Sequence, residues 1–422
     1  MNVTVSGPCQ LHGQITVSGA KNSATRIMSA ALLGDGPVAL HNFPTQLEDV
    51  KAKLTFIRQL GANCDLDDTQ NLALLSPGSV SVDRLNSFDL PVRTTYLLAA
   101  VQLLHSGRAK VPYPGGCKIG SRGYDLHMHV WQQLGCEAVE KADYIDVSGR
   151  LQGGVIDFPI STVGGTESAL LCGAVASGTT IIRNAYVTPE VSDLICFLQR
   201  LGADIELEGS SVIRIRGAGG KLGNTEYSVM PDRIEALTWI ILGAASGGQL
   251  QINNVPFDSL QVPLIHLRAA GIDVLQNTHS ALISPACIGR HGIQPFEIAC
   301  GTHPGIHTDM QSFFTFLALF AEGRSTIHDY RYPERIQYAS ELAKFTNATI
   351  EARPGRLRVD GPARLTGTAA DSTDLRGSMC LLMAALCAEG ESTISAIELA
   401  LRGYNDLPNK LKNVGADCNW HS

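Results

Sequence analysis

One pattern of apolar and polar positions recurs six times along the chain. Each copy has an apolar helical segment that ends at a glycine, a short β-like run, and a second helical segment that ends near Leu-Gly-Ala. The glycines after the first segments are Gly36, Gly107, Gly178, Gly247, Gly323 and Gly390. Their spacing of roughly 70 residues is typical of a repeat architecture.

The second helical segments end near a residue that tolerates left-handed backbone angles. These residues are Gly61, Gly135, Gly202, Gly271, Asn347 and Gly415. Glycine or asparagine there, and glycine after the first segments, predicts left-handed helix C-caps. Apolar and polar residues alternate after most of the second segments, as in 203–207, which predicts half-buried strands. Each copy is therefore predicted to be a small α/β unit.

The first helical segments are apolar on nearly all sides, for example in residues 96–104 and 380–388. Such helices are predicted to lie inside, with the sheets outside them, which inverts the usual arrangement in which helices cover a sheet. Six copies divide most simply into two domains of three. The polar, glycine-rich stretch 217–228 lies at the predicted boundary.

Counting back from each of the six glycines by the same number of residues gives six equivalent positions at the starts of the first helices. They are Asn22, Arg93, Gly164, Arg233, Asp309 and Arg376. A helix dipole disfavours cations at its N-terminus, so three arginines there indicate an anionic ligand. The alternative is that these arginines neutralise nearby carboxylates such as Asp232, Glu235 and Asp374. Asp309 has an alternative interpretation as an N-cap.

More cations lie at matching points of the copies, namely Lys21, Arg122, Arg335 and Arg402. A compact anion that is both phosphorylated and carboxylated would use this charge, because arginine binds either group with two parallel hydrogen bonds. The sequence has no Walker A motif, no dinucleotide-binding GxGxxG after a strand, and no Gly-x-Ser-x-Gly elbow. Nucleotide hydrolysis, nicotinamide chemistry and serine hydrolase chemistry are thus disfavoured.

A glycine-rich loop, PYPGGCKIGSR from Pro112 to Arg122, contains the cysteine with the strongest chemical signal. Its glycines allow close approach to a ligand, and Lys118 and Arg122 favour the thiolate of Cys117. The alternative is that Cys117 is a small apolar filler in a turn.

Composition limits the class of protein. The chain has 422 residues, 44% of them hydrophobic and 17% charged, with a net charge of -7, which suggests two or three domains. There is no long basic run, so neither nucleic acid nor a membrane surface is expected as a partner. No signal peptide or membrane-spanning run is found, which favours a cytoplasmic protein. The 11 cysteines form no CxxC pairs or Cys/His clusters, so no disulfide framework and no metal site are expected.

Seven motifs together resemble the UDP-N-acetylglucosamine 1-carboxyvinyltransferase family, which is related to the 5-enolpyruvylshikimate-3-phosphate synthases. They are SGAKN, PGGCKIGSR, YDLH, PDRIE, TDMQ, TDLR and LRGY, and they run from end to end of the chain. The resemblance implies a two-domain inside-out α/β barrel with six βαβαββ-like repeats, three per domain. It implies domains of residues 1–20 plus 231–422 and of residues 21–230, which close over the active site when substrate binds.

The resemblance also implies transfer of the enolpyruvyl group of phosphoenolpyruvate to the 3-hydroxyl of the UDP-sugar, the first committed step of peptidoglycan synthesis. No cofactor is implied. Asp309 would take the hydroxyl proton, Cys117 would act as general acid, and Lys21 and Arg402 would complete the catalytic set. The implied phosphoenolpyruvate-binding residues are Lys21, Asn22, Arg93, Arg122, Arg335, Arg376 and Arg402. The implied nucleotide-binding residues are Asn22, Arg122, Asp125, Leu126, Thr162, Val163, Gly164 and Asp309.

The chain departs from the family pattern at two places on the acceptor side. It reads DYRYPERI before and around Arg335, where the family has a sugar-facing phenylalanine segment, and Ile160 stands in place of a lysine. Another uridine nucleotide, such as UMP in a specialised pathway, is therefore an alternative acceptor. A noncatalytic nucleotide-binding homologue is the alternative from a different functional class.

Overall fold

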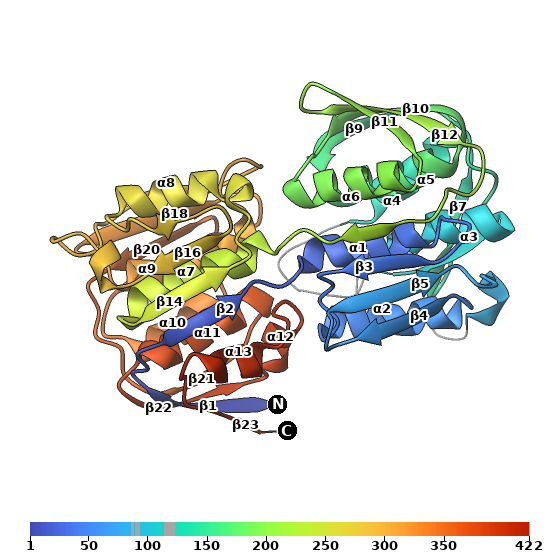
Figure 1. Ribbon diagram of the computed structural model, residues 1–422. Helices are drawn as coiled ribbons and strands as arrows, with labels where there is room; N and C mark the ends of the chain where they lie inside the picture. Colours follow the sequence, from blue (N-terminus) through green and yellow to red (C-terminus); the bar gives the residue numbers. More distant parts are fainter. Residues whose placement is uncertain (86–87, 89–92, 114–122, 422) are drawn as a thin grey trace. The chain divides into compact units, whose positions relative to one another are not determined.

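The computed structural model describes residues 1–85, 88, 93–113 and 123–421, and these fold into two compact units (Figure 1). Unit 1 contains Met1–Ser18 and Pro231–Ser422, and unit 2 contains the described residues from Gly19 to Met230. Within the described residues, the chain passes between the units after Ser18 and after Met230.

Unit 2 contains three of the described sheets. Its strands are β3 (Val38–His41), β4 (Asn63–Asp67), β5 (Leu72–Ser76), β6 (Arg108–Pro112), β7 (Glu137–Glu140), β8 (Tyr144–Ser148), β9 (Val155–Thr162), β10 (Ser177–Ala185), β11 (Asp204–Glu208), β12 (Val212–Ala218) and β13 (Glu226–Ser228). The strand orders are β13-β3-β5-β4, β6-β8-β7 and β11-β12-β10-β9. The pairs β13/β3 and β10/β9 are parallel and the other described pairs are antiparallel.

Unit 1 contains the other three described sheets. Its strands are β1 (Asn2–Gly7), β2 (His12–Thr16), β14 (Gln249–Asn253), β15 (Leu275–Gln276), β16 (Ser280–Ile283), β17 (Glu297–Cys300), β18 (Arg324–Asp329), β19 (Ile350–Arg353), β20 (Arg356–Asp360), β21 (Ala369–Asp371), β22 (Gly390–Ser395) and β23 (Cys418–His421). The strand orders are β15-β16-β14-β2, β17-β18-β20-β19 and β21-β22-β1-β23. The N-terminal strands therefore complete sheets formed by the C-terminal half, with Val3 opposite Ile394 and Ile15 opposite Ile252.

Six helices correspond to the apolar first segments, three in each unit. They are α1 (Lys21–Ala31), α3 (Leu98–Ser106), α5 (Val163–Val175), α7 (Arg233–Ser246), α9 (Gln311–Ala318) and α11 (Leu375–Cys387). Short 3-10 helices, η2 (Arg93–Leu97) and η5 (Thr308–Met310), lead into α3 and α9. These helices are largely buried, and in α11 every residue except Cys387 is buried. The predicted α/β class is confirmed.

The second helical segments are shorter or more amphipathic. They form α2 (Glu48–Gln59), α4 (Asp125–Gln133), α6 (Pro189–Arg200), α8 (Gln261–Ala269), α10 (Tyr338–Leu342) and α13 (Leu407–Asn413), with η1 (Val82–Arg84), η3 (Phe257–Ser259), η4 (Pro285–Cys287), η6 (Ala343–Phe345) and α12 (Glu398–Leu401) between elements. In α6, Thr188 caps the N-terminus by accepting a hydrogen bond from the Val191 N–H at 3.3 Å. Pro189 lies in the first turn, where its missing N–H leaves no hydrogen bond unmade. Thr188 and Pro189 together therefore mark the start of this helix in the sequence.

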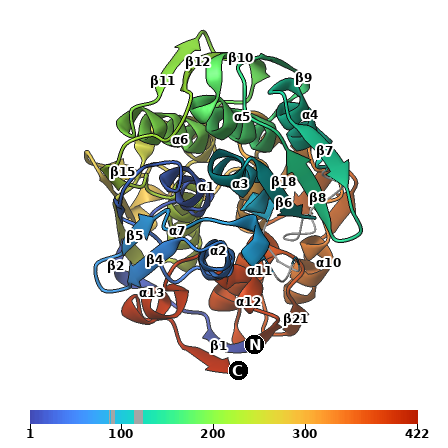
Figure 2. The same ribbon diagram turned by 90° about the vertical axis from the view of Figure 1, so that its right-hand side faces the viewer.

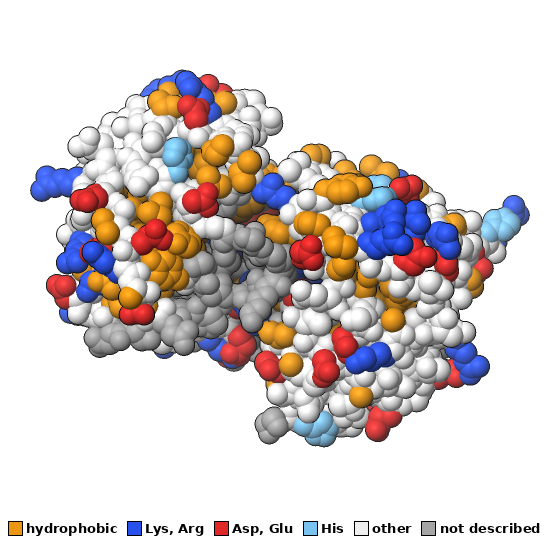
Figure 3. Space-filling view, turned by 180° about the vertical axis from the view of Figure 1, so that it is seen from behind, with side chains coloured by type: hydrophobic (Ala, Val, Ile, Leu, Met, Phe, Trp, Pro, Cys, Tyr) orange, Lys and Arg blue, Asp and Glu red, His pale blue; other side chains and the backbone are white. Residues whose placement is uncertain are grey.

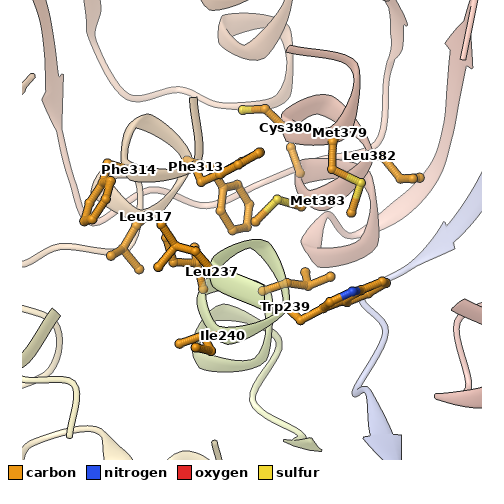
Figure 4. Packing of buried hydrophobic residues seen from close by; sticks show 14 of the residues in the cluster. Leu237, Trp239, Ile240, Phe313, Phe314, Leu317, Met379, Cys380, Leu382 and Met383 are labelled. Atoms are coloured by element: carbon orange, nitrogen blue, oxygen red, sulfur yellow. The ribbon is translucent and has the colours of Figure 1, made fainter. Parts of the chain in front are cut away.

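Each unit has its own hydrophobic core. In unit 1, side chains of α7, α9 and α11 meet one another, including Leu237, Phe313 and Met383 (Figure 4). In unit 2, α5 and α6 lie beside the sheet formed by β9, β10, β11 and β12 (Figure 2). The strands of that sheet alternate, because Ile213 and Ile215 are fully buried while Arg216 is exposed. Burial on one face explains the period-two pattern in the sequence.

The predicted C-caps after the first helices are only partly confirmed. Gly107 and Gly247 are left-handed C-caps, with φ of 66° and 68°. Gly178, Gly323 and Gly390 also have positive φ, but they lie where the next strand begins rather than at the helix end. Gly36 is not in the left-handed region. The helix before it ends earlier, at Ala31, so this residue caps nothing.

The prediction for the second helices is confirmed at five glycines. Gly61, Gly135, Gly202, Gly271 and Gly415 follow the helix ends with φ between 83° and 98°. Asn347 does not have a positive φ, so the prediction there is wrong. The reason is local: the chain continues from α10 into the 3-10 helix η6 and then becomes extended at Thr346.

The surface of the described chain carries mixed charge. Basic and acidic side chains are interspersed on the face shown in Figure 3. No helix among the described residues is long and apolar enough to cross a membrane. Of the ten described cysteines, all free thiols, seven are buried and Cys196 is exposed.

Candidate active-site residues

The equivalent positions found by counting along the sequence do lie at helix starts. Asn22 and Gly164 are second residues of α1 and α5, Arg93 opens η2, Arg233 opens α7, Asp309 lies in η5, and Arg376 is the second residue of α11. The prediction of one structural register at six helix N-termini is therefore confirmed. The side chain of Arg93 lies outside what the structure describes, and so do Cys117 and Arg122.

In unit 1, two arginines bind the carboxylate of Asp309. Nη1 of Arg335 lies 2.6 Å from Oδ1 of Asp309, and Nε of Arg376 lies 3.3 Å from Oδ2. Nη2 of Arg335 also lies 3.3 Å from the carboxylate of Asp374. Both arginine side chains are at most 4% exposed, so these charges are held in a water-poor environment where they interact strongly.

This pairing sets the acidity of Asp309. Burial would raise the pKa of its carboxyl group, but the charges of Arg335 and Arg376 outweigh burial and hold the pKa well below its usual range. Asp309 is therefore ionised, and it is a weak base while both arginines contact it.

The guanidinium group of Arg376 is only partly used by the protein. Its Nη1 and Nη2 atoms are buried and make no hydrogen bond of regular geometry to the described residues, and, against burial, the side chain of Tyr404 is the neighbour that helps to raise the pKa of Arg376. The group lies over the ring of Tyr404, 5.2 Å from the ring centroid. Buried donors without a partner are rare in folded proteins, and a charged one is costly. A planar guanidinium group with free donor capacity has the geometry that phosphate and carboxylate groups match.

Local sequence explains why these side chains stand where they do. Asp374 caps α11 by accepting hydrogen bonds from the N–H groups of Arg376 at 3.1 Å and Gly377 at 3.4 Å. Before α9, Nδ1 of His307 accepts the Asp309 N–H at 3.1 Å. His307 is thus the cap, and the interpretation of Asp309 as an N-cap is wrong. Its carboxylate is available for the arginines instead.

The alternative in which the arginines at the helix starts neutralise nearby acids holds in part. Arg376 does pair with a carboxylate, that of Asp309. Asp232, however, caps α7 by accepting the N–H groups of Ile234 and Glu235, and the side chain of Glu235 binds Lys410. The partner that Arg376 and Arg335 share is Asp309, which this alternative did not name.

The segments that carry Arg335 and Arg402 both reach this cluster. Asp329 holds the unusual DYRYPERI segment, because its Oδ1 accepts the N–H groups of Arg331 at 3.1 Å and Tyr332 at 3.0 Å. Arg402 follows α12 directly and is half-buried. A methyl group on its neighbour Gly403 would lie 3.1 Å from Nη1 of Arg376, so the LRGY segment packs against that guanidinium.

In unit 2, Lys21 opens α1 and its Nζ lies 2.9 Å from Oδ2 of Asp49, in the first turn of α2. Asn22 is the next residue and is half-buried. The lysine and its carboxylate partner come from different helices, so the sequence alone gave no sign of the pair. A cation at this helix start, next to a polar amide, can hold an anionic ligand.

Five of the predicted nucleotide-binding residues lie at two helix starts of unit 2. Asp125 and Leu126 open α4, and Thr162 caps α5 by accepting the Gly165 N–H at 3.3 Å. Val163 and Gly164 open α5. A methyl group on Gly164 would lie 3.2 Å from the ring of His127, so the two helix starts are neighbours.

His127 is a residue that the sequence reasoning missed. Its Nδ1 lies 2.6 Å from Oγ of Ser168, and its ring stacks on Tyr96 with 4.4 Å between centroids. Its place after Asp125 and Leu126 in YDLH was the available signal. Ile160, which departs from the family pattern, is 59% exposed on β9 and offers no charge there.

Among the described residues, no group of three or more His, Cys, Asp or Glu side chains is arranged to hold a metal ion.

Comparisons with known proteins agree on one family. The family described as EPSP synthase (3-phosphoshikimate 1-carboxyvinyltransferase) matches residues 5–411. The UDP-N-acetylglucosamine 1-carboxyvinyltransferases of Paracoccus denitrificans and Chlorobium limicola are each 36% identical to this chain, and each alignment covers 98% of this chain and 97% of the relative.

Solved structures give the same result for the fold. The enolpyruvyl transferase NikO from Streptomyces tendae superposes with a TM-score of 0.88 at 25% identity, covering 99% of this chain and 98% of that one. EPSP synthase from Acinetobacter baumannii superposes with a TM-score of 0.76 at 16% identity over 99% of both chains, which supports the fold alone. From the near full-length family match and these relatives, we conclude that the chain belongs to the EPSP synthase (3-phosphoshikimate 1-carboxyvinyltransferase) family and is a transferase.

Proposed function

We propose that this protein transfers the enolpyruvyl group of phosphoenolpyruvate to the 3-hydroxyl of UDP-N-acetylglucosamine and releases phosphate, the first committed step of peptidoglycan synthesis. Support comes from the full-length relatives that carry this name and from the cations at the helix starts. Both substrates are anionic, and we propose no metal or organic cofactor for this reaction.

One observation carries the proposal: Arg376 is buried at a helix start with two donors that make no hydrogen bond of regular geometry to the described residues. A phosphate or carboxylate would accept both donors at once, because guanidinium and these anions match in geometry. Arg335 and Arg402 lie on segments that reach the same cluster. A phosphorylated carboxylic acid is the ligand that best uses this charge.

The proposed roles follow the predicted sets. Phosphoenolpyruvate is bound by Lys21, Asn22, Arg93, Arg122, Arg335, Arg376 and Arg402. The nucleotide sugar is bound by Asn22, Arg122, Asp125, Leu126, Thr162, Val163, Gly164 and Asp309. Asp309 removes the proton of the attacking hydroxyl, and Cys117 donates a proton to the methylene carbon of phosphoenolpyruvate. Lys21 and Arg402 stabilise the charge that moves toward the departing phosphate.

The ion pairs of Asp309 fit its proposed role as a base whose pKa rises when phosphoenolpyruvate binds. In the free protein, Arg335 and Arg376 hold its pKa low. When phosphoenolpyruvate takes up the positive charge of these arginines, their pull on Asp309 weakens and its pKa rises. Its proton affinity thus increases when the donor substrate is present.

We also propose the finer architecture that the resemblance implies. It is a two-domain inside-out α/β barrel with domains of residues 1–20 plus 231–422 and 21–230. The burial of α1, α3, α5, α7, α9 and α11, and the grouping of the described sheets in threes, support it. The cysteine loop belongs to the sequence of the second of these domains.

The function is tested by incubating the protein with phosphoenolpyruvate and one acceptor at a time while phosphate release is measured. Turnover with UDP-N-acetylglucosamine, and none with UMP, is expected. Turnover with UMP alone would show that DYRYPERI and Ile160 mark a change of acceptor. Binding of both ligands without any phosphate release would identify a noncatalytic homologue.

A further inference from the structure

A lysine is buried completely inside unit 2. Lys53 lies on α2 and is 0% exposed. Its ammonium group donates to the main-chain oxygen of Thr25 in α1 and, at 3.2 Å, to the main-chain oxygen of Thr94 in η2. Its described hydrogen bonds are therefore both to backbone carbonyls, and neither partner is a carboxylate.

A buried ammonium group without a carboxylate partner is unfavourable, because the backbone oxygens replace only part of its hydration. Burial lowers the pKa of Lys53 well below its usual range, the charge of Arg26 lowers it further, and Glu167 opposes this. An apolar side chain would fill the same space at lower cost. The position of Lys53 thus suggests a role other than filling the core.

The fold itself does not require charge at this depth. Arg26, four residues after the equivalent position Asn22, forms an ion pair with Glu167 of α5 at 2.9 Å. In unit 1 the residues four after the equivalent positions are Leu237, Phe313 and Cys380, and all three lie in the hydrophobic core (Figure 4). At this position of the repeat, the charge of Arg26 is therefore not shared by the three copies of unit 1.

The two carbonyls that Lys53 binds are next to residues with proposed substrate roles. Thr94 directly follows Arg93. Thr25 lies one turn after Lys21, and its hydroxyl donates to the main-chain oxygen of Lys21 at 3.1 Å. Asp49, one turn before Lys53 on the same helix, binds the side chain of Lys21. Helix α2 therefore contacts the starts of both α1 and η2.

We propose that Lys53 is a positioning residue for phosphoenolpyruvate binding. By holding both carbonyls, it fixes the main chain beside Arg93 against the helix that carries Lys21 and Asn22. The two cations, Lys21 and Arg93, are thereby spaced for the anion before it binds. Because Lys21 and Arg93 take their roles from the proposed function, this inference rests on it.

The test replaces Lys53 by methionine, which keeps the length of the side chain but donates no hydrogen bond. Lys51→Met on the same helix is the matched control, since Lys51 is exposed and binds only Glu48. We expect Lys53→Met to raise KM for phosphoenolpyruvate about 10-fold and to leave KM for UDP-N-acetylglucosamine within about 2-fold. The melting temperature should change little, because the removal of a buried ammonium group offsets the loss of its two hydrogen bonds. The control should change none of these.

A purely structural role predicts the opposite result, namely a lower melting temperature with both KM values unchanged or raised equally, and that result would overturn the inference. If Lys53→Met does not fold, Lys53→Leu, which also donates no hydrogen bond, is compared with wild type in the same way. An unchanged KM for phosphoenolpyruvate in that variant counts against the proposal.

Calorimetric binding of phosphoenolpyruvate separates the two proposals. A wild-type protein that binds phosphoenolpyruvate but does not turn it over refutes the proposed function, and the ratio of dissociation constants for wild type and Lys53→Met still tests the positioning role. A wild-type protein that does not bind phosphoenolpyruvate refutes both. Turnover by wild type with an unchanged dissociation constant in the variant refutes the positioning role alone.

Discussion

Asp309 owes its properties to residues that are distant in sequence. Arg335 and Arg376, 26 and 67 positions away, bind its two oxygens from different segments of unit 1. A carboxylate in this setting is fully ionised but weakly basic until its cations are engaged elsewhere. The same contacts thus join three segments of unit 1, and under the proposed function they also link the base to substrate binding.

Replacing Asp309 by asparagine should abolish most of the activity. The amide keeps the shape but cannot take a proton, so we expect kcat to fall at least about 100-fold. Phosphate release in the presence of both substrates measures this. Asp360→Asn is the control, because Asp360 binds only surface arginine Arg324 through its side chain in unit 1. A variant Asp309→Asn with more than about a tenth of wild-type activity would exclude Asp309 as the base.

Asp309 should also make stability depend on pH in a defined direction. Its pKa in the folded protein lies below the ordinary value of 3.8, so its contribution to the free energy of unfolding is fully present above that pH. The contribution is lost as the pH falls through the folded pKa. Melting temperatures of wild type and Asp309→Asn should therefore differ most near neutral pH and converge in acid. A difference that grows on acidification would contradict the ion-pair assignment.

For single residues, the sequence predicted the place in the fold better than it predicted the contacts of the side chain. Counting from the repeated glycines found Asp309 and Arg376 at helix starts, because one period fixes equivalent points in every copy. It could not find the contact of Lys21 with Asp49, which depends on how α2 packs on α1. Lys53 was missed for a similar reason: a lysine among the charged residues of 48–53 is typical of an exposed helix face, and only packing buries it.

The hydrophobic period of the sequence predicted which segments form helices and which form strands. The residue at which each helix ends depends on the element that follows it. The all-apolar segments became buried helices, and the alternating segments became strands of sheets with one buried face. The predicted cap at Gly36 failed because α1 ends five residues earlier, and that at Asn347 failed because a 3-10 turn intervenes. A glycine signals a break in the helix, but the next element determines where the break falls.

The cap at Gly247 gives a test at the level of one helix. Gly247 ends α7 with φ of 68°, and a methyl group there would meet no atom within 4 Å, so Gly247→Ala should cost about 1 kcal/mol through the backbone alone. Gly301→Ala is the control, because that site is equally open and is not left-handed. Chemical denaturation measures both. Equal effects of the two substitutions would show that Gly247 has no special conformational role.

The whole molecule reflects the repeat directly. Six copies in the sequence correspond to six described sheets, three in each unit, around two separate cores. What local pattern cannot give is long-range pairing. Strands β1 and β2 at the N-terminus join sheets whose other strands come after residue 248, and only the family resemblance placed the first residues with the C-terminal half.

The central claim concerns one bond, formed between the enolpyruvyl carbon and the 3-oxygen of the sugar. It is tested most directly by incubating the protein with phosphoenolpyruvate and UDP-N-acetylglucosamine and examining the product by NMR. The account predicts a vinyl ether whose carbon correlates with position 3 of the sugar, together with one phosphate released for each product formed. Phosphate released without a new sugar ether, or an unchanged mixture under conditions where the protein is folded, would contradict it.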